Sequence, residues 1–189
     1  MINMISKKIV QYLITASDIE TEAEQVEVYI YGLECFLNTA ITVLILFIWG
    51  FLINTFTETC CWIISFSILR HHSGGLHAPT QLSCIISSCL LGISNSLVIE
   101  LLSYQTINAW CIFFFCVSIC FLYAPTDTSK YQLTESIRNK EKFYSILIII
   151  IGCFIALILK NSISISILYS YICVCILLLL KVILRKIRS

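Results

Sequence analysis

Hydrophobic residues run through the chain in long, nearly uncharged stretches separated by short polar segments. Six such stretches can be read from the sequence, at 37–53, 56–69, 82–102, 107–123, 143–159 and 163–180. An apolar segment of about 20 residues crosses a bilayer as an α-helix, whereas barrel strands would alternate apolar and polar residues over about ten positions. The pattern therefore predicts an all-α, polytopic membrane protein with about six transmembrane helices. The second and fourth stretches are short for a crossing.

The first 34 residues differ from the rest. Residues 2–14 place apolar side chains at helical spacing beside Lys7 and Lys8, which favours an amphipathic helix lying on the membrane surface. The acidic segment 18–34 continues as a polar helix with a solvated face. We expect no cleavable signal peptide, since no long apolar core precedes the acidic run. No internal repeat is visible, so 1–189 is expected to form a single integral membrane domain.

Composition supports the membrane assignment and excludes other classes. Hydrophobic residues make up 59% of the 189 positions and charged residues only 12%. A soluble domain carries about 25% charged residues, so this chain lacks the polar surface to remain in water. The formal net charge of +1 gives no indication of nucleic-acid binding. The lipid bilayer is therefore an expected partner, and nucleic acid is not.

The positions of the basic residues predict the orientation. Of the 12 lysines and arginines, only Lys160 lies in a segment assigned to the outer side. The other eleven lie on the opposite side, at Lys7, Lys8, Arg70, Lys130, Arg138, Lys140, Lys142, Lys181, Arg185, Lys186 and Arg188. Positively charged loops stay in the cytoplasm. Both termini, and the segment from 70 to 84, are therefore expected on the cytoplasmic face of a bacterial cell membrane.

Reactive residue types gather in one segment, 70–84, which reads RHHSGGLHAPTQLSC. It holds all three histidines of the chain, a Gly-Gly pair, one of the two prolines and a cysteine. Glycine adopts backbone angles closed to other residues, so the chain is expected to turn sharply at Gly74-Gly75. Proline favours the first turn of a helix. The third span is therefore expected to begin near Ala78.

That helix start would place Cys84 in the second turn, close to the membrane boundary. A helix N-terminus and a nearby imidazolium both favour the reactive thiolate. Cys84 and His77 thus have the chemistry of a nucleophilic pair, in which the thiolate attacks a carbonyl and the imidazole takes and returns the proton. Seven residues of separation do not establish contact, and interfacial histidines beside a buried cysteine are the alternative.

The order of segments, a Tyr-Ala-Pro tripeptide at 123–125, and one set of loop residues together resemble the accessory gene regulator B (AgrB) family. The loop residues are Arg70, Gly75, His77, Ala78, Pro79 and Cys84. The resemblance covers essentially the whole chain. It implies a membrane cysteine endopeptidase of bacterial quorum sensing with no cofactor. Such enzymes remove the C-terminal tail of a small precursor, AgrD, through an acyl-enzyme thioester and promote closure of a thiolactone or lactone ring.

The resemblance also assigns roles to individual residues. The catalytic histidine and cysteine correspond to His77 and Cys84, while Arg70 and Gly75 match positions that the family uses. Family precursors have an amphipathic leader and an acidic tail, so a basic loop at 127–142 is a candidate to hold that tail, through Lys130, Arg138, Lys140 and Lys142. The same residues satisfy the orientation rule.

Two carboxylates lie near or inside apolar segments, where ionisable groups are usually functional. Glu34 precedes the first span on the cytoplasmic side and is a candidate to orient His77. Glu100 lies sixteen residues after Cys84, roughly 24 Å along a helix, and is expected on the far side of the membrane. A dyad of His77 and Cys84 is the simpler assignment.

Three alternatives remain open. The histidines at 71, 72 and 77 could form a metal site, but no HExxH motif accompanies them, and no metal is expected. A small membrane transporter or exporter of a peptide or an ion is the second alternative. Ser83 as the nucleophile is the third. The small residues of 82–102 also offer a helix-pairing surface, which leaves a homodimer open.

Overall fold

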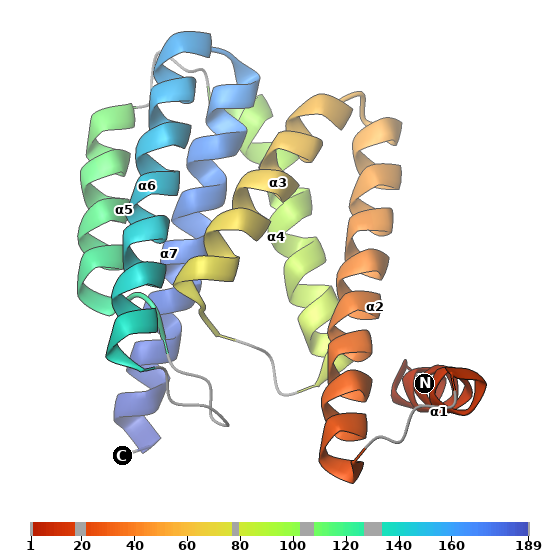
Figure 1. Ribbon diagram of the computed structural model, residues 1–189. Helices are drawn as coiled ribbons and strands as arrows, with labels where there is room; N and C mark the ends of the chain where they lie inside the picture. Colours follow the sequence, from red (N-terminus) through yellow and green to blue (C-terminus); the bar gives the residue numbers. More distant parts are fainter. Residues whose placement is uncertain (1, 18–21, 77–79, 103–107, 127–133, 189) are drawn as a thin grey trace. The chain divides into compact units, whose positions relative to one another are not determined.

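The computed structural model describes residues 2–17, 22–76, 80–102, 108–126 and 134–188. These described residues form seven helices and contain no strand, which confirms the all-α prediction (Figure 1). The helices are α1 (Ile2–Ser17), α2 (Ala23–Leu52), α3 (Phe56–Ser73), α4 (Gln81–Leu101), α5 (Ala109–Tyr123), α6 (Glu135–Leu159) and α7 (Ser162–Arg188).

Each of the six apolar stretches lies in a helix, but three helices extend well into polar sequence. α2 begins at Ala23 instead of residue 37, α6 begins at Glu135 instead of residue 143, and α7 continues to Arg188. The acidic segment and the first span are therefore one continuous helix. This segment contains no proline, and its one glycine before the span, Gly32, is in open space.

Among the described residues, four helices are long and apolar enough to cross a membrane: Gln25–Leu52, Gln81–Leu101, Glu135–Leu159 and Ser162–Ile187. α5 has only 15 residues, and a helix of that size is about 23 Å long at roughly 1.5 Å per residue. A bilayer core is about 30 Å thick. Length and composition thus support four crossing helices, and the count of six stays a prediction.

The chain divides into two compact units. The first comprises Met1–Ile45 with Ala78–Cys89, and the second comprises Leu46–His77 with Leu90–Ser189.

In the first unit, α1 is joined to α2 by a hydrogen bond from the Asn3 side-chain amide to the Glu34 carboxylate. Ser6 and Val10 are buried, and Lys7 is exposed. A helix over the N-terminal residues is confirmed, and its position on a membrane surface stays a prediction.

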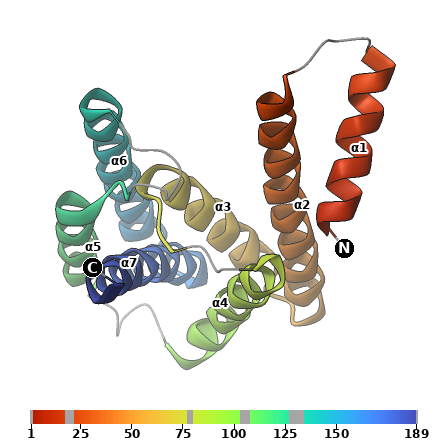
Figure 2. The ribbon, with the colours of Figure 1, turned by 90° about the horizontal axis from the view of Figure 1, so that it is seen from below.

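The second unit is built around α7. This helix packs against α3, α5 and α6, as the view in Figure 2 also shows. Its fully buried positions recur at helical spacing; they include Leu168, Val174, Cys175 and Leu178. The surrounding helices contribute Trp62, Leu69, Cys116, Cys120 and Ile149 to the same core. α3 ends at Ser73, and the part of the segment 70–84 that follows it is called the reactive loop below. This packing fixes α3 to the centre of the second unit.

Small and polar side chains allow the helices of the second unit to approach closely. The Asn95 amide donates to Ser166 Oγ at 3.2 Å, and the hydroxyls of Ser94 and Tyr169 lie 2.7 Å apart. Gly152 lies against the Tyr171 ring, whose hydroxyl donates to the Ile148 carbonyl at 3.2 Å. Such interhelical hydrogen bonds and small residues are typical of helix packing in membranes.

Gly152→Ala tests this packing. The new methyl would meet the ring carbon Cζ of Tyr171 at 2.6 Å, so α6 and α7 must separate, and overpacking of this kind costs about 1–3 kcal/mol. We expect a lower midpoint of thermal unfolding in detergent. The matched control is Gly32→Ala, where nothing lies within 4 Å and the helix should gain about 0.5–1 kcal/mol. Equal stability of the two variants would contradict the packing described.

Candidate active site

The reactive loop begins with a sharp turn after α3. Gly74 has φ +72° and Gly75 has φ +139°, a region of backbone space that favours glycine. The Gly74 N–H donates to the Arg70 carbonyl at 3.0 Å and closes the last turn of the helix. The predicted sharp turn at the Gly-Gly pair is confirmed.

The Arg70 side chain packs against the inner side of this turn. Its guanidinium donates a hydrogen bond to the Leu76 carbonyl and lies 5.9 Å from the centre of the Phe66 ring. It also occupies the space where a side chain on Gly75 would have to lie. Arg70 and Gly75 are therefore brought into direct contact, as two parts of one turn.

The segment 74–76 is also tied to other elements of the second unit. The Leu76 N–H donates to the carbonyl of Leu177 in α7 at 3.2 Å. The Gly75 N–H donates to Thr126 Oγ1 at 3.0 Å. Together with the Gly74 bond, these contacts occupy all three backbone N–H groups of the segment. Thr126 was not singled out by the sequence, although it directly follows the Tyr-Ala-Pro tripeptide.

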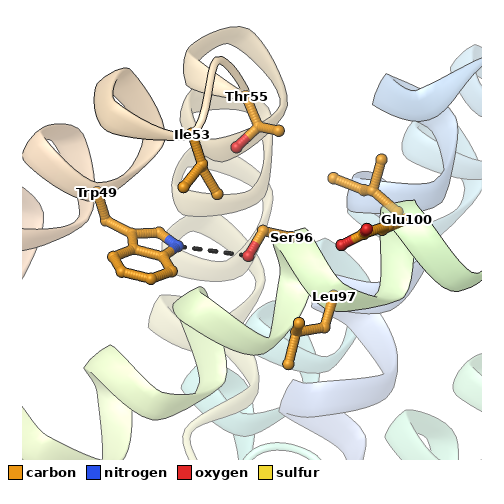
Figure 3. Close-up of a pocket in the computed structure, with 7 residues that line it drawn as sticks. Trp49, Ile53, Thr55, Ser96, Leu97 and Glu100 are labelled. Atoms are coloured by element: carbon orange, nitrogen blue, oxygen red, sulfur yellow. Dashed lines mark hydrogen bonds between the residues drawn. The ribbon is translucent and has the colours of Figure 1, made fainter.

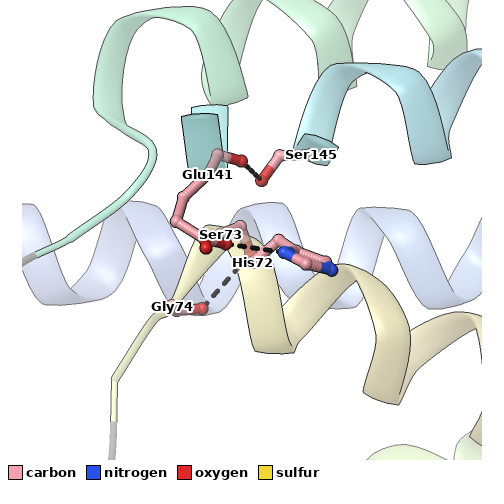
Figure 4. Close-up of polar contacts among 5 residues, drawn as sticks. All are labelled: His72, Ser73, Gly74, Glu141 and Ser145. Atoms are coloured by element: carbon pink, nitrogen blue, oxygen red, sulfur yellow. Dashed lines mark hydrogen bonds and ion pairs between the residues drawn. The ribbon is translucent and has the colours of Figure 1, made fainter. Parts of the chain in front are cut away.

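The neighbouring histidines His71 and His72 differ in their surroundings, and Figure 4 shows the polar contacts of His72. His72 Nδ1 lies 2.6 Å from a carboxylate oxygen of Glu141 in α6, and the Ser145 hydroxyl donates to the Glu141 carbonyl at 2.9 Å. His71 is exposed. His72 thus joins α3 to α6. Within the described ranges no group of three His, Cys, Asp or Glu residues could hold a metal ion; His77 lies outside those ranges.

Cys84 lies in the first turn of α4, not in the second as predicted. The helix begins at Gln81, and the Cys84 N–H donates to the Thr80 carbonyl at 3.1 Å. Thr80 and Ser83 cap this end reciprocally: the Ser83 N–H donates to Thr80 Oγ1 at 3.2 Å and the Thr80 N–H to Ser83 Oγ at 3.3 Å. Because the Thr-x-x-Ser pattern supplies the cap, Pro79 does not define the start of the described helix. The Ser83 hydroxyl is engaged in this cap, and Cys84 is half-buried.

Tyr31 of α2 lies near Cys84 in the first unit. The Tyr31 hydroxyl hydrogen-bonds with the Cys35 thiol, and both Cys84 and Glu34 are close enough to interact with Tyr31 electrostatically. Tyr31 was not identified from the sequence, where it reads as an aromatic residue of a helix. Glu34 accepts its hydrogen bond from Asn3. The predicted contact of Glu34 with His77 falls outside the described residues.

The basic residues assigned to a loop lie partly on a helix. Arg138, Lys140 and Lys142 belong to the first turns of α6, with Lys140 and Lys142 packed over the rings of Tyr144 and Phe121 at 5.9 and 5.3 Å. The helix begins early because its first residue, Glu135, is acidic, which suits a helix N-terminus. Lys130 lies outside the described residues.

A cavity of about 450 Å³ lies at the other end of α4 (Figure 3). Trp49, Thr55, Ser96 and Glu100 contribute its polar groups, and the Trp49 indole donates to Ser96 Oγ at 3.3 Å. Glu100 is one residue from the end of α4. This agrees with the prediction that Glu100 and Cys84 belong to opposite ends of the same helix, about 24 Å apart along its axis.

Comparison with known proteins now adds to this geometry. The profile of the family described as "Accessory gene regulator B" matches residues 6–182. The chain belongs to this AgrB family. An AgrB-like protein of Clostridium perfringens (strain SM101) is 31% identical over 84% of this chain and 77% of its own length. A second from strain 13 is 28% identical over 82% and 75%.

The Accessory gene regulator protein B of Staphylococcus aureus (strain Newman) is 25% identical over 115 residues. That match spans 61% of each protein. No solved structure matches the chain. AgrB family membership, together with the long apolar helices, makes this a membrane protein.

Gly75→Ala tests the turn of this AgrB chain. Alanine would have to adopt φ +139° and displace the Arg70 guanidinium from its place against residue 75. Strained conformations of this kind cost on the order of 1–3 kcal/mol. We expect a lower midpoint of thermal unfolding in detergent. An unchanged midpoint would show that the turn does not depend on glycine at position 75.

Proposed function

We propose that this chain is a membrane-embedded cysteine endopeptidase of an accessory gene regulator quorum-sensing system. Family membership supports a role in that system. The observation that carries the enzymatic assignment is the position of Cys84, half-buried in the capped first turn of α4. Its rival Ser83 is engaged with Thr80. Of the two, the thiol is the group free to react.

The helix start suits a nucleophilic thiolate. Side chains on a helix lean toward its N-terminus, so the Cys84 thiol lies over the turn where backbone N–H groups have no partner within the helix. The positive end of the helix dipole stabilises an anion there. His77 is proposed as the base that takes the thiol proton, and Glu34 as a candidate to orient it.

The proposed reaction passes through an acyl-enzyme. The Cys84 thiolate adds to the scissile carbonyl of an AgrD-like precursor, the C–N bond breaks, and His77 returns the proton to the departing amine of the tail. A thiol or hydroxyl of the bound precursor then attacks the thioester, which forms the ring and releases the Cys84 thiolate. Thioester exchange retains the acyl-transfer potential that direct closure from an amide would lack. Exclusion of water would favour closure over hydrolysis.

Two sets of backbone N–H groups are candidates to bind the oxyanion, those of the Gly-Gly turn and those at the start of α4. The backbone N–H groups of Gly74, Gly75 and Leu76 all donate to acceptors within the second unit. At the start of α4, the Ser83 and Cys84 N–H groups donate to Thr80. We therefore propose that the oxyanion binds at the start of α4, because the first amides of a helix have no acceptor within it and preorganised donors stabilise a tetrahedral intermediate.

Charge supports the proposed substrate and orientation. Arg138, Lys140 and Lys142 on α6, with Lys130 before them, would attract the acidic tail of the precursor. Arg70 supports the site through the Leu76 carbonyl. The distribution of basic residues also favours six crossings with both termini in the cytoplasm, which is where a newly made precursor would meet the loop. A homodimer would be compatible with the small residues of α4.

Replacement of Cys84 tests the proposal. The chain is reconstituted in nanodiscs with a precursor that has an amphipathic leader, a cysteine or serine core and an acidic tail, taken from the reading frame adjoining its gene. Cys84→Ala should lower tail release at least about a thousandfold, as for other nucleophile deletions. Release is measured by mass spectrometry.

Two matched controls act on the same helix. Ser83→Ala removes only a capping hydroxyl, and Cys89→Ala removes a buried thiol five residues further on. Both should retain cleavage within about tenfold, since a lost cap costs about 1 kcal/mol. Full cleavage by Cys84→Ala would end the assignment. Loss of cleavage in Ser83→Ala but not in Cys84→Ala would assign the role of nucleophile to Ser83.

A further inference from the structure

Thr126 joins three segments of the second unit. Its hydroxyl oxygen accepts one hydrogen bond from the Gly75 N–H and one from Lys181 Nζ of α7, each at 3.0 Å. Its own N–H donates to the Ser73 carbonyl at 3.2 Å. A hydroxyl has two acceptor lone pairs, and both are used here. Thr126 therefore links the end of α3 and the turn after it to α7.

The packing around this hydroxyl is close. A side chain on Gly74 would meet Thr126 Oγ1 at 2.7 Å, and Gly75 itself is buried. Without the Thr126 oxygen, the buried Gly75 N–H would lose its acceptor, which is costly in a low-dielectric interior. The Lys181 ammonium fixes the oxygen from the other side.

The segment 75–76 leads directly into His77. Both backbone polar groups of Leu76 are held, the N–H by Leu177 and the carbonyl by Arg70. The Gly75 N–H is held by Thr126. Since a peptide chain has only two soft dihedral angles per residue, these bonds fix the backbone of Gly75 and Leu76, the two residues that precede His77 in the sequence.

We propose that Thr126 is a positioning residue for the His77-bearing segment, with Lys181 holding the Thr126 hydroxyl in place. This inference rests on the proposed function, in which His77 is the general base. It predicts an effect on the chemical step and little effect on substrate binding, because Thr126 aligns a reacting group without itself touching the precursor. Small misplacements of a reacting group can cost about a hundredfold in rate.

The test compares Thr126→Val with Thr126→Ser in the nanodisc cleavage assay. Valine keeps the shape of the side chain and lacks the acceptor oxygen, whereas serine keeps the oxygen. Thr126→Val should lower kcat about ten- to a hundredfold with KM within about twofold, and Thr126→Ser should retain most of kcat. Lys181→Met should lower kcat less, and its effect should not add to that of Thr126→Val, since both act through one oxygen.

A second readout separates this inference from the proposed function. Amide hydrogen exchange of peptides covering 74–76, followed by mass spectrometry, should be faster in Thr126→Val and near wild type in Thr126→Ser. This holds whether or not the chain cleaves the precursor. Absence of cleavage by the wild-type chain would refute the proposed function while exchange still reports on Thr126. Unchanged exchange and kcat in Thr126→Val, or equal losses in both variants, would overturn the positioning role.

Discussion

A backbone N–H or C=O that is buried away from water must find a hydrogen-bond partner within the protein. The helices meet this demand internally. The segment after α3 cannot, because it leaves the helix at Gly74, and its N–H groups are satisfied instead by Arg70, Thr126 and Leu177. The chain can therefore be non-helical next to its reactive residues only because α3, α7 and the residues after α5 supply these acceptors.

The two sides of the reactive loop differ in how their backbone N–H groups are satisfied. On the side of α3, the backbone donors are all engaged, so this side provides a fixed frame. On the side of α4, Thr80 and Ser83 cap the helix start. The half-buried Cys84 lies in this capped first turn. The fixed frame and the proposed nucleophile thus belong to sequences on either side of residues 77–79.

The elements that depend on local pattern were predictable. The six apolar stretches, the turn at Gly74-Gly75 and the position of Glu100 at the far end of α4 follow from periodicity and glycine chemistry. The sequence places the start of α4 near Ala78 on the preference of proline for a first helical turn, whereas the helix begins at Gln81 behind the Thr80–Ser83 cap.

Contacts between distant parts of the chain could not be foreseen in the same way. Thr126 meets Gly75 across 51 positions and His72 meets Glu141 across 69. No periodicity encodes such pairs, since they arise only when α3, α5 and α6 pack around α7. The pairing of His72 also shows why residue type alone could not rank the three histidines.

The most direct measurement is the trapping of the acyl-enzyme. A precursor whose ring-closing cysteine or serine is replaced by alanine can be cleaved but cannot cyclise, so the thioester should accumulate on the wild-type chain. Intact-protein mass spectrometry should then show an added mass equal to the leader and core. Peptide mapping should place it on Cys84, and hydroxylamine should remove it. Release of the tail at the normal rate with no adduct, or with the adduct on another residue, would contradict a Cys84 acyl-enzyme.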